Sequence, residues 1–167
     1  MEFIRRLREH ASRLGAVIVL PEIDDERTLR AAAVIRDEGV ARPVLLGASD
    51  VALDGLRALD LSPDGIAFVD PATDAGRDEL AASFHAKRKH KGLSLDEARE
   101  AVRSPLLYGA LMVDAGRADG MVAGAVHSTG DVLRAGFQAI GTAPDRSLVS
   151  ARQSTRTTGW ELGTDGT

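Results

Sequence analysis

Short apolar runs alternate with longer segments of helical periodicity along most of the chain. The runs at 16–20, 44–46, 66–69 and 121–123 are compact and bounded by Gly, Pro or charged residues. Such runs are typical of strands that are buried on both faces of a parallel sheet. Helices are expected over about 2–14, 25–38, 49–60, 74–91 and 104–116, with a short helix from Ser94 and a last helix from Gly130. This alternation predicts one α/β domain.

The most distinctive unit lies between Ala118 and Ile140, with the sequence ADGMVAGAVHSTGDVLRAGFQAI. A short strand at 121–123 is followed by a turn of small and hydroxyl-bearing residues, and a helix follows from Gly130. Leu133, Gly136, Phe137 and Ile140 share one face of this helix, and Asp131, Arg134 and Gln138 share another. The start of a helix presents unpaired backbone N–H groups, which favour anions such as phosphate. The segment therefore predicts an anion site at this loop.

Composition excludes several classes of protein. The chain has 167 residues, of which 44% are hydrophobic and 28% are charged, as in ordinary soluble domains. The net charge of −4 gives no support for a nucleic-acid partner, and the absence of Cys excludes disulfides and a thiolate nucleophile. No apolar run approaches the length of a membrane span, and the charged N-terminal segment is unlike a signal peptide. A cytoplasmic protein without membrane or nucleic-acid partners is expected.

A basic run occupies residues 87–91, where four of five positions are Lys or Arg. One interpretation is a solvated helix end, because cations are favoured at the C-terminus of a helix. The other is a clamp for phosphate groups, in which Arg88 takes part. The residues alone leave both interpretations open.

The polar residues of the loop at 124–129 also have two interpretations. Ser128 and Thr129 are candidates either for helix capping or for contacts to a bound anion. Arg134 lies one turn into the helix and is placed to reach the same anion, but Asp131 three residues earlier is an alternative partner. His127 is either a loop histidine with satisfied hydrogen bonds or a site residue. No metal is expected, because the spacing of the four His fits no metal motif, and no nucleotide-binding motif is present.

Several stretches resemble the phosphate acetyltransferase (phosphotransacetylase) family, which includes phosphate butyryltransferases. They are LPE, DERTLRAAAVIRDEGVARPVLLG, KRKHKG and SPLLYGALMVDAGRADGMVAGAVHSTGDVLRAGFQAIGTAP. The resemblance covers roughly residues 17–150 and is most specific over 104–144. It implies a three-layer α/β sandwich with a mostly parallel, Rossmann-like sheet, as in the isocitrate/isopropylmalate dehydrogenase-like superfamily.

The resemblance also implies a reaction, which is acyl transfer between coenzyme A and phosphate, with acetyl-CoA and phosphate giving acetyl phosphate and CoA. CoA, acetyl phosphate and phosphate are expected as substrates, no resident cofactor is expected, and the full-length family is expected to form homo-oligomers. The matching positions imply a substrate-binding set of Arg88, Gly124, His127, Ser128, Thr129 and Arg134.

The resemblance further implies that the catalytic base comes from a C-terminal half that this sequence does not match. Residues 1–150 are therefore interpreted as the N-terminal α/β domain and 151–167 as an irregular tail unlike the family. A truncated or frameshifted gene is one hypothesis, and downstream DNA without a family-like strand in any frame would contradict it. The chain alone is expected to turn over negligibly. The alternatives are a non-catalytic CoA- or phosphate-binding remnant, a regulatory phosphotransacetylase-like module, and butyryl in place of acetyl as the acyl group.

Overall fold

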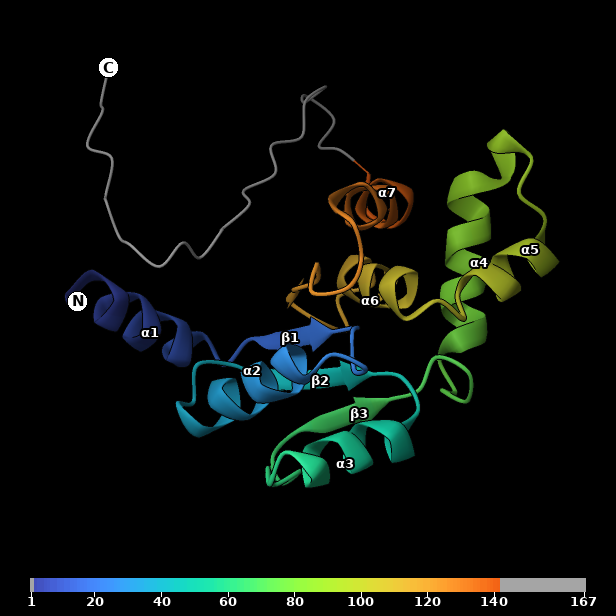
Figure 1. Ribbon diagram of the computed structural model, residues 1–167. Coiled ribbons are helices and arrows are strands. Elements are labelled where there is room, and N and C mark those ends of the chain that lie inside the picture. The colour runs from blue at the N-terminus through green and yellow to red at the C-terminus, as the bar shows by residue number, and fades with distance from the viewer. Residues whose placement is uncertain (1, 142–167) are drawn as a thin grey trace, which may run out of the picture.

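Four parallel strands form the centre of the molecule (Figure 1). The computed structural model describes residues 2–141. The strands are β1 (Val17–Leu20), β2 (Arg42–Leu46), β3 (Ala67–Val69) and β4 (Gly120–Met121), in the order β3-β2-β1-β4. All three strand pairs are parallel. The expected parallel α/β architecture is confirmed.

The helices lie on both faces of this sheet (Figure 1). They are α1 (Glu2–Leu14), α2 (Glu26–Asp37), α3 (Ser49–Ala58), α4 (Arg77–Arg88), α5 (Leu95–Ala101), α6 (Pro105–Asp114) and α7 (Thr129–Ala139), with a 3-10 turn η1 (Lys89–Lys91) after α4. Helices α2 and α3 lie against one face of the sheet, and α6 and α7 are stacked over the other.

Alternate strand residues point to the two sides of the sheet and build two cores. Val19, Val44 and Leu46 pack with residues of α4, α5, α6 and α7. Leu20 and Leu45 pack with residues of α2 and α3. Because successive side chains of a strand face opposite ways, strands that are apolar throughout must be covered on both faces. The three-layer sandwich is confirmed.

Helix α6 is the most buried helix described, since every residue from Leu106 to Met112 is buried. It approaches the sheet closely at Gly109, where an added Cβ would lie 2.8 Å from Met121 Sδ and 3.1 Å from side-chain carbons of Leu46 and Val19. A larger residue there would push the helix away from the strands. The close packing at Gly109 holds α6 against β1, β2 and β4.

The start of α4 differs from the sequence-based expectation. The local sequence favours a helix cap at Thr73 or Asp74, but α4 starts after Gly76. The Asp74 carboxylate instead accepts hydrogen bonds from the Tyr108 hydroxyl and from Arg117. Burial raises the pKa of Tyr108 and Asp74 raises it further, to about 12. Asp74 thus joins the start of α4 to α6 rather than capping a helix.

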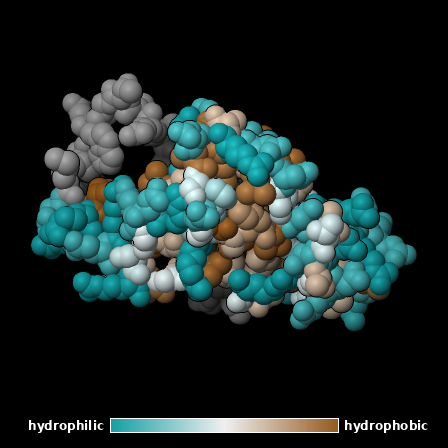
Figure 2. All heavy atoms as spheres, turned by 90° about the horizontal axis from the view of Figure 1, so that it is seen from below, coloured by the Kyte–Doolittle hydropathy of each residue, from teal (hydrophilic) through white to brown (hydrophobic). Residues whose placement is uncertain are grey.

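Helix α7 packs through small residues rather than through its larger apolar ones. Ala135 and Ala139 are buried against the core, while Phe137 and Ile140 are exposed. Helix α1 buries no residue at all. Figure 2, which views the molecule from below Figure 1, shows apolar surface in the middle of that face, bordered by polar residues. No helix within residues 2–141 is long and apolar enough to cross a membrane.

The domain boundary expected at residue 150, and the tail expected at 151–167, lie outside the described residues.

Candidate functional site

The candidate site lies where the chain changes direction across the sheet. From β1 the chain runs through β2 to β3 on one side, and β4 then pairs with the other side of β1. The loops that follow β1 and β4 therefore leave the carboxyl edge of the sheet side by side, which is where open α/β sheets usually bind ligands. These two loops carry Glu22 and the segment Gly124–His127, called here the β4 loop.

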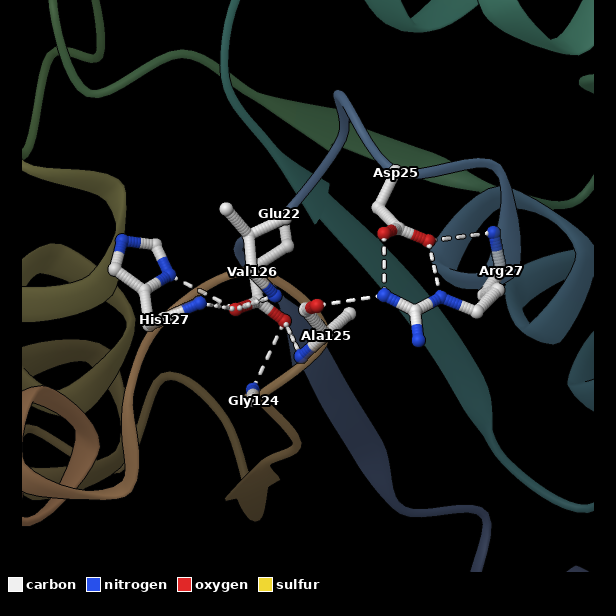
Figure 3. A network of polar contacts seen from close by, with 7 residues as sticks. All are labelled: Glu22, Asp25, Arg27, Gly124, Ala125, Val126 and His127. Carbon is white, nitrogen blue, oxygen red and sulfur yellow. Dashed lines mark hydrogen bonds and ion pairs between the residues drawn. The ribbon is translucent and has the colours of Figure 1, made fainter.

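The Glu22 carboxylate fills the concave side of the β4 loop (Figure 3). Its Oε2 accepts from the N–H of Gly124 at 2.9 Å and of Ala125 at 2.7 Å. Its Oε1 accepts from the N–H of Val126 at 3.0 Å and of His127 at 2.8 Å, and lies 2.9 Å from His127 Nδ1. Five nitrogens thus surround one carboxylate, and Gly124 supplies the φ of +115° with which the turn begins.

The environment of Glu22 keeps it ionised. The residue is 4% exposed. Burial raises its pKa, but the hydrogen bonds from His127, Val126 and Ala125 outweigh burial and lower the pKa to about 2. A carboxylate held by several N–H groups is strongly favoured as the anion. The negative charge at this edge of the sheet is therefore supplied by the protein itself.

A second contact holds the β4 loop from the outside. Arg27 donates from Nη2 to the carbonyl oxygen of Ala125 at 2.6 Å (Figure 3). The same guanidinium forms a two-point pair with Asp25, at 2.9 and 2.7 Å, and Asp25 also caps α2. The hydrogen bonds from Arg27 lower the pKa of Asp25 to about 2. The peptide group between Ala125 and Val126 is thereby held at the Ala125 C=O by Arg27 and at the Val126 N–H by Glu22.

The expectation of free N–H groups is wrong for the β4 loop, because Glu22 occupies them. Free N–H groups are found instead at the start of α7. No described residue accepts a hydrogen bond from the N–H of Thr129 or Gly130, at the start of α7. Ser128 is the cap, since its Oγ accepts from the N–H of Asp131 at 3.2 Å and donates to the Asp131 carboxylate at 2.6 Å. The available donors are therefore at the helix start itself.

A cavity of about 300 Å³ lies beside this helix start. It is lined by Ser104, Leu106, Leu107, His127, Asp131, Arg134, Ala135 and Gln138. Arg134 is 66% exposed and pairs with Asp131 at 2.9 Å, so the local ion pair considered from the sequence is present. The hydrogen bond from Ser128 is the main cause that lowers the pKa of Asp131. Exposure leaves the Arg134 guanidinium able to exchange this partner for a ligand.

Arg88 lines a second cavity, of about 370 Å³, together with Phe84, Lys91, Gly92, Leu93, Glu97, Ala101 and Gln138. Gln138 lines both cavities, so the Arg134 and Arg88 sides of the candidate site adjoin along α7. The nearby Lys87 points elsewhere, since it binds the Asp114 carboxylate and the carbonyl oxygen of Ala139. The basic run thus divides into a structural lysine and cations that border a cavity.

All six expected binding residues lie along this region, but in different roles. Gly124 shapes the β4 loop, Ser128 and Thr129 begin α7, and the side chains of His127 and Arg134 line the first cavity. Arg88 lines the adjoining one. No group of three or more metal-binding side chains is present among residues 2–141.

Two residues of the site were missed or misread in the sequence. The charged cluster from Glu22 to Arg27 indicates helix-start chemistry first and a wall of the site second, and the sequence places Gln138 only on a helix face. The useful signal for Glu22 was its position directly after a buried strand, at LPE. The contact of Glu22 with the β4 loop could not be predicted without knowing that β4 pairs with β1.

Similarity to known proteins agrees with this fold. The architecture is an α/β fold with its polar loops at the carboxyl ends of parallel strands. The chain belongs to the family described as phosphate acetyl/butaryl transferase, which matches residues 2–159.

Relatives and solved structures name the same activity. A phosphate acetyltransferase from Thermoanaerobacterium thermosaccharolyticum is 38% identical over 166 residues, which cover 99% of this chain and 50% of the relative. One from Acetivibrio thermocellus is 39% identical over 151 residues, covering 90% of this chain and 45% of the relative. The crystal structure of a phosphotransacetylase from Streptococcus pyogenes has a TM-score of 0.81 at 36% identity and covers 86% of this chain and 43% of its own. A phosphotransacetylase from Staphylococcus aureus has a TM-score of 0.81 at 35% identity and covers 88% and 44%. The chain spans about half the length of the curated relatives it matches.

Proposed function

We propose that this chain forms the CoA- and phosphate-facing part of a phosphate acetyltransferase. The observation that carries the proposal is the pair of adjoining cavities, in which Arg134 and Arg88 lie on either side of Gln138. Both substrates carry phosphate groups, and guanidinium groups bind phosphate by charge-assisted hydrogen bonds in pairs. Family membership supports the acyl-transfer chemistry.

In the proposed reaction, an oxygen of phosphate attacks the thioester carbonyl of acetyl-CoA. The carbonyl oxygen becomes an oxyanion in the tetrahedral intermediate, and collapse of the intermediate breaks the C–S bond and releases the CoA thiolate. In the reverse direction the CoA thiol loses its proton to a base, the sulfur attacks the carbonyl carbon of acetyl phosphate, and the C–O bond to phosphate breaks and releases inorganic phosphate. Arg134 and the N–H groups of Thr129 and Gly130 would hold phosphate oxygens, because they are cationic or unpaired donors at one helix start.

Titration calorimetry with CoA and with inorganic phosphate tests the proposal on the 167-residue chain. Replacing Arg134 by Ala removes a charged donor, and such bonds are worth about 1.5–3 kcal/mol. The dissociation constant for CoA should then rise roughly 10- to 100-fold. Arg57→Ala is the matched control, because Arg57 is an exposed arginine of α3 that pairs only with Asp54 among the described residues. Absence of CoA binding, or equal effects of the two substitutions, would contradict the proposal.

An assay of acetyl-CoA formation from acetyl phosphate and CoA separates binding from turnover. We expect binding with negligible turnover, since the resemblance places the base in the half of the family that this chain does not match. Measurable turnover would show that the base lies within the 167 residues. The same assay with butyryl phosphate tests the acyl group.

A further inference from the structure

The hydrogen bonds of Glu22 determine the protonation of the His127 ring as well as the shape of the β4 loop. The two residues are 105 positions apart in the sequence and meet only because β1 and β4 are neighbours. Glu22 Oε1 receives the backbone N–H and the ring of the same histidine. One carboxylate oxygen therefore fixes both the main chain and the side chain of His127.

The contact at the ring determines which nitrogen carries the proton. An ionised carboxylate only accepts hydrogen bonds, and Oε1 lies 2.9 Å from Nδ1. Nδ1 must then donate, so a neutral His127 ring has its proton on Nδ1 and an unprotonated Nε2. Figure 3 shows the second ring nitrogen of His127 pointing away from Glu22. His127 also lines the cavity that contains Arg134.

The charged groups that face this ring do not compete for Nδ1. Asp131 and Arg134 come from α7 and pair with each other, and Asp131 is also bound by Ser128. The start of α6 contributes only Ser104, Leu106 and Leu107 to the cavity, none of which is charged. Glu22 is therefore the carboxylate that sets the protonation pattern of the ring.

We propose that Glu22 is a positioning residue that holds His127 in the Nδ1–H tautomer and so presents an unprotonated Nε2 to the Arg134 cavity. This inference rests on the function proposed above for its biological meaning. There, Nε2 would act as a hydrogen-bond acceptor for a protonated group of the ligand, such as a thiol or a phosphate hydroxyl. The tautomer itself is a property of the ligand-free chain.

Long-range ¹H–¹⁵N NMR spectra of the histidine rings test the proposal on the full chain, without ligand, at about pH 8.5, where an ordinary His is neutral. His127 should show a protonated Nδ1 and a bare Nε2, which is the minor tautomer of a free histidine. His10 and His90 are exposed and serve as internal references in the same spectrum. A predominant Nε2–H form at His127 would overturn the proposal.

Two variants assign the effect to Glu22. Glu22→Gln should return His127 toward the tautomer mixture of the reference histidines, whereas Asp131→Asn should leave the Nδ1–H form unchanged. An unchanged His127 spectrum in folded Glu22→Gln, or a changed one in Asp131→Asn, would overturn the assignment. If Glu22→Gln does not fold, the wild-type and Asp131→Asn spectra still decide it. Failure of CoA binding would instead contradict the proposed function and leave the tautomer result standing.

Discussion

From the sequence, the β4 loop and the basic run Lys87–Lys91 are both candidates for binding anions. In the part of the chain that the structure describes, the donors of the first are bound within the chain, whereas most cations of the second are not. Every N–H of the β4 loop is bound to Glu22, so its capacity for anions is satisfied within the chain. In the basic run only Lys87 makes an ion pair among the described residues, while Arg88 and Lys91 border a cavity.

This difference shows that donor-rich backbone does not by itself mark a ligand site. A buried carboxylate on a neighbouring loop accepts hydrogen bonds from these backbone donors, so they are no longer available to a ligand and instead connect the two loops. We call this contact between Glu22 and the β4 loop the joint. The groups that remain available lie on either side of that joint, at the start of α7 and at the end of α4. The comparison separates residues that build the site from residues that face its ligand.

The largest expected effect on stability comes from removing the Glu22 carboxylate from the β4 loop. Glu22→Ala leaves four loop N–H groups without their partner, and each unsatisfied buried group costs about 1–3 kcal/mol. We expect a total loss of roughly 3–5 kcal/mol in the free energy of unfolding, because entering water restores part of the bonding. Urea denaturation measures it. Glu100→Ala, at an exposed pair on α5, is the control and should change stability by less than about 0.5 kcal/mol.

The second prediction concerns the loss of stability at low pH. The pKa of Glu22 falls from an ordinary value of 4.5 to about 2 in the folded chain. Its contribution to stability is therefore complete above about pH 4.5 and is lost as the pH falls toward 2. A difference of this size corresponds to roughly 3 kcal/mol. Urea denaturation of wild type and Glu22→Gln between pH 6 and pH 2.5 should show a shallower acid loss in the variant, and parallel curves would contradict this account.

A smaller effect is expected from the outer contact of the β4 loop. Arg27→Gln removes the donor to the Ala125 carbonyl but leaves the Glu22 bonds in place. Amide hydrogen exchange within Gly124–His127 should become faster, with a smaller drop in melting temperature than Glu22→Ala causes. Arg30→Gln is the matched control on α2, since its pair with Glu26 is long, at 3.9 Å. Equal exchange in the two variants would show that Arg27 does not hold the loop.

The smallest expected effect on stability should distinguish two lysines of the basic run. Lys87→Met loses the contacts to Asp114 and Ala139, and we expect a loss of roughly 1 kcal/mol because the side chain is 39% exposed. Lys89→Met, at an exposed position of η1, should stay within about 0.5 kcal/mol. Thermal denaturation of both variants measures the difference. A larger loss for Lys89 would remove the distinction drawn between the two lysines.

The sequence predicted the layers of this fold because local patterns determine them. The parallel strands, the capping box at Ser94 and Pro105 at the start of α6 all follow from neighbouring residues, and the structure confirms each. The buried positions of α2 were also predicted, since Leu29, Ala32 and Ala33 follow its helical period.

The errors occurred where a distant partner decides the outcome. Asp74 resembled a cap but binds Tyr108 and Arg117, which lie 34 and 43 residues away. The helical period places Ala115 on the inward face with Leu107 and Leu111, but Ala115 is an exposed residue at the end of α6. Helix α7 has a larger apolar face that stays exposed, because close packing against α6 selects its alanines.

The candidate site shows the same limit. The residues expected to bind substrate lie along one region, but the sequence did not predict that Glu22 accepts the hydrogen bonds of the β4 loop. This contact depends on the strand order, which no local pattern encodes.

The doubly held peptide group between Ala125 and Val126 has a consequence for the thermodynamics of recognition. Its C=O is bound by Arg27 and its N–H by Glu22, two residues close to the start of α2, so the peptide plane has no freedom to flip. The conformational entropy of the β4 loop is lost when the chain folds rather than when a ligand arrives. A ligand that binds beside it should therefore show little entropic penalty from the backbone, and its affinity should depend mainly on the arginine side chains that must be immobilised around it.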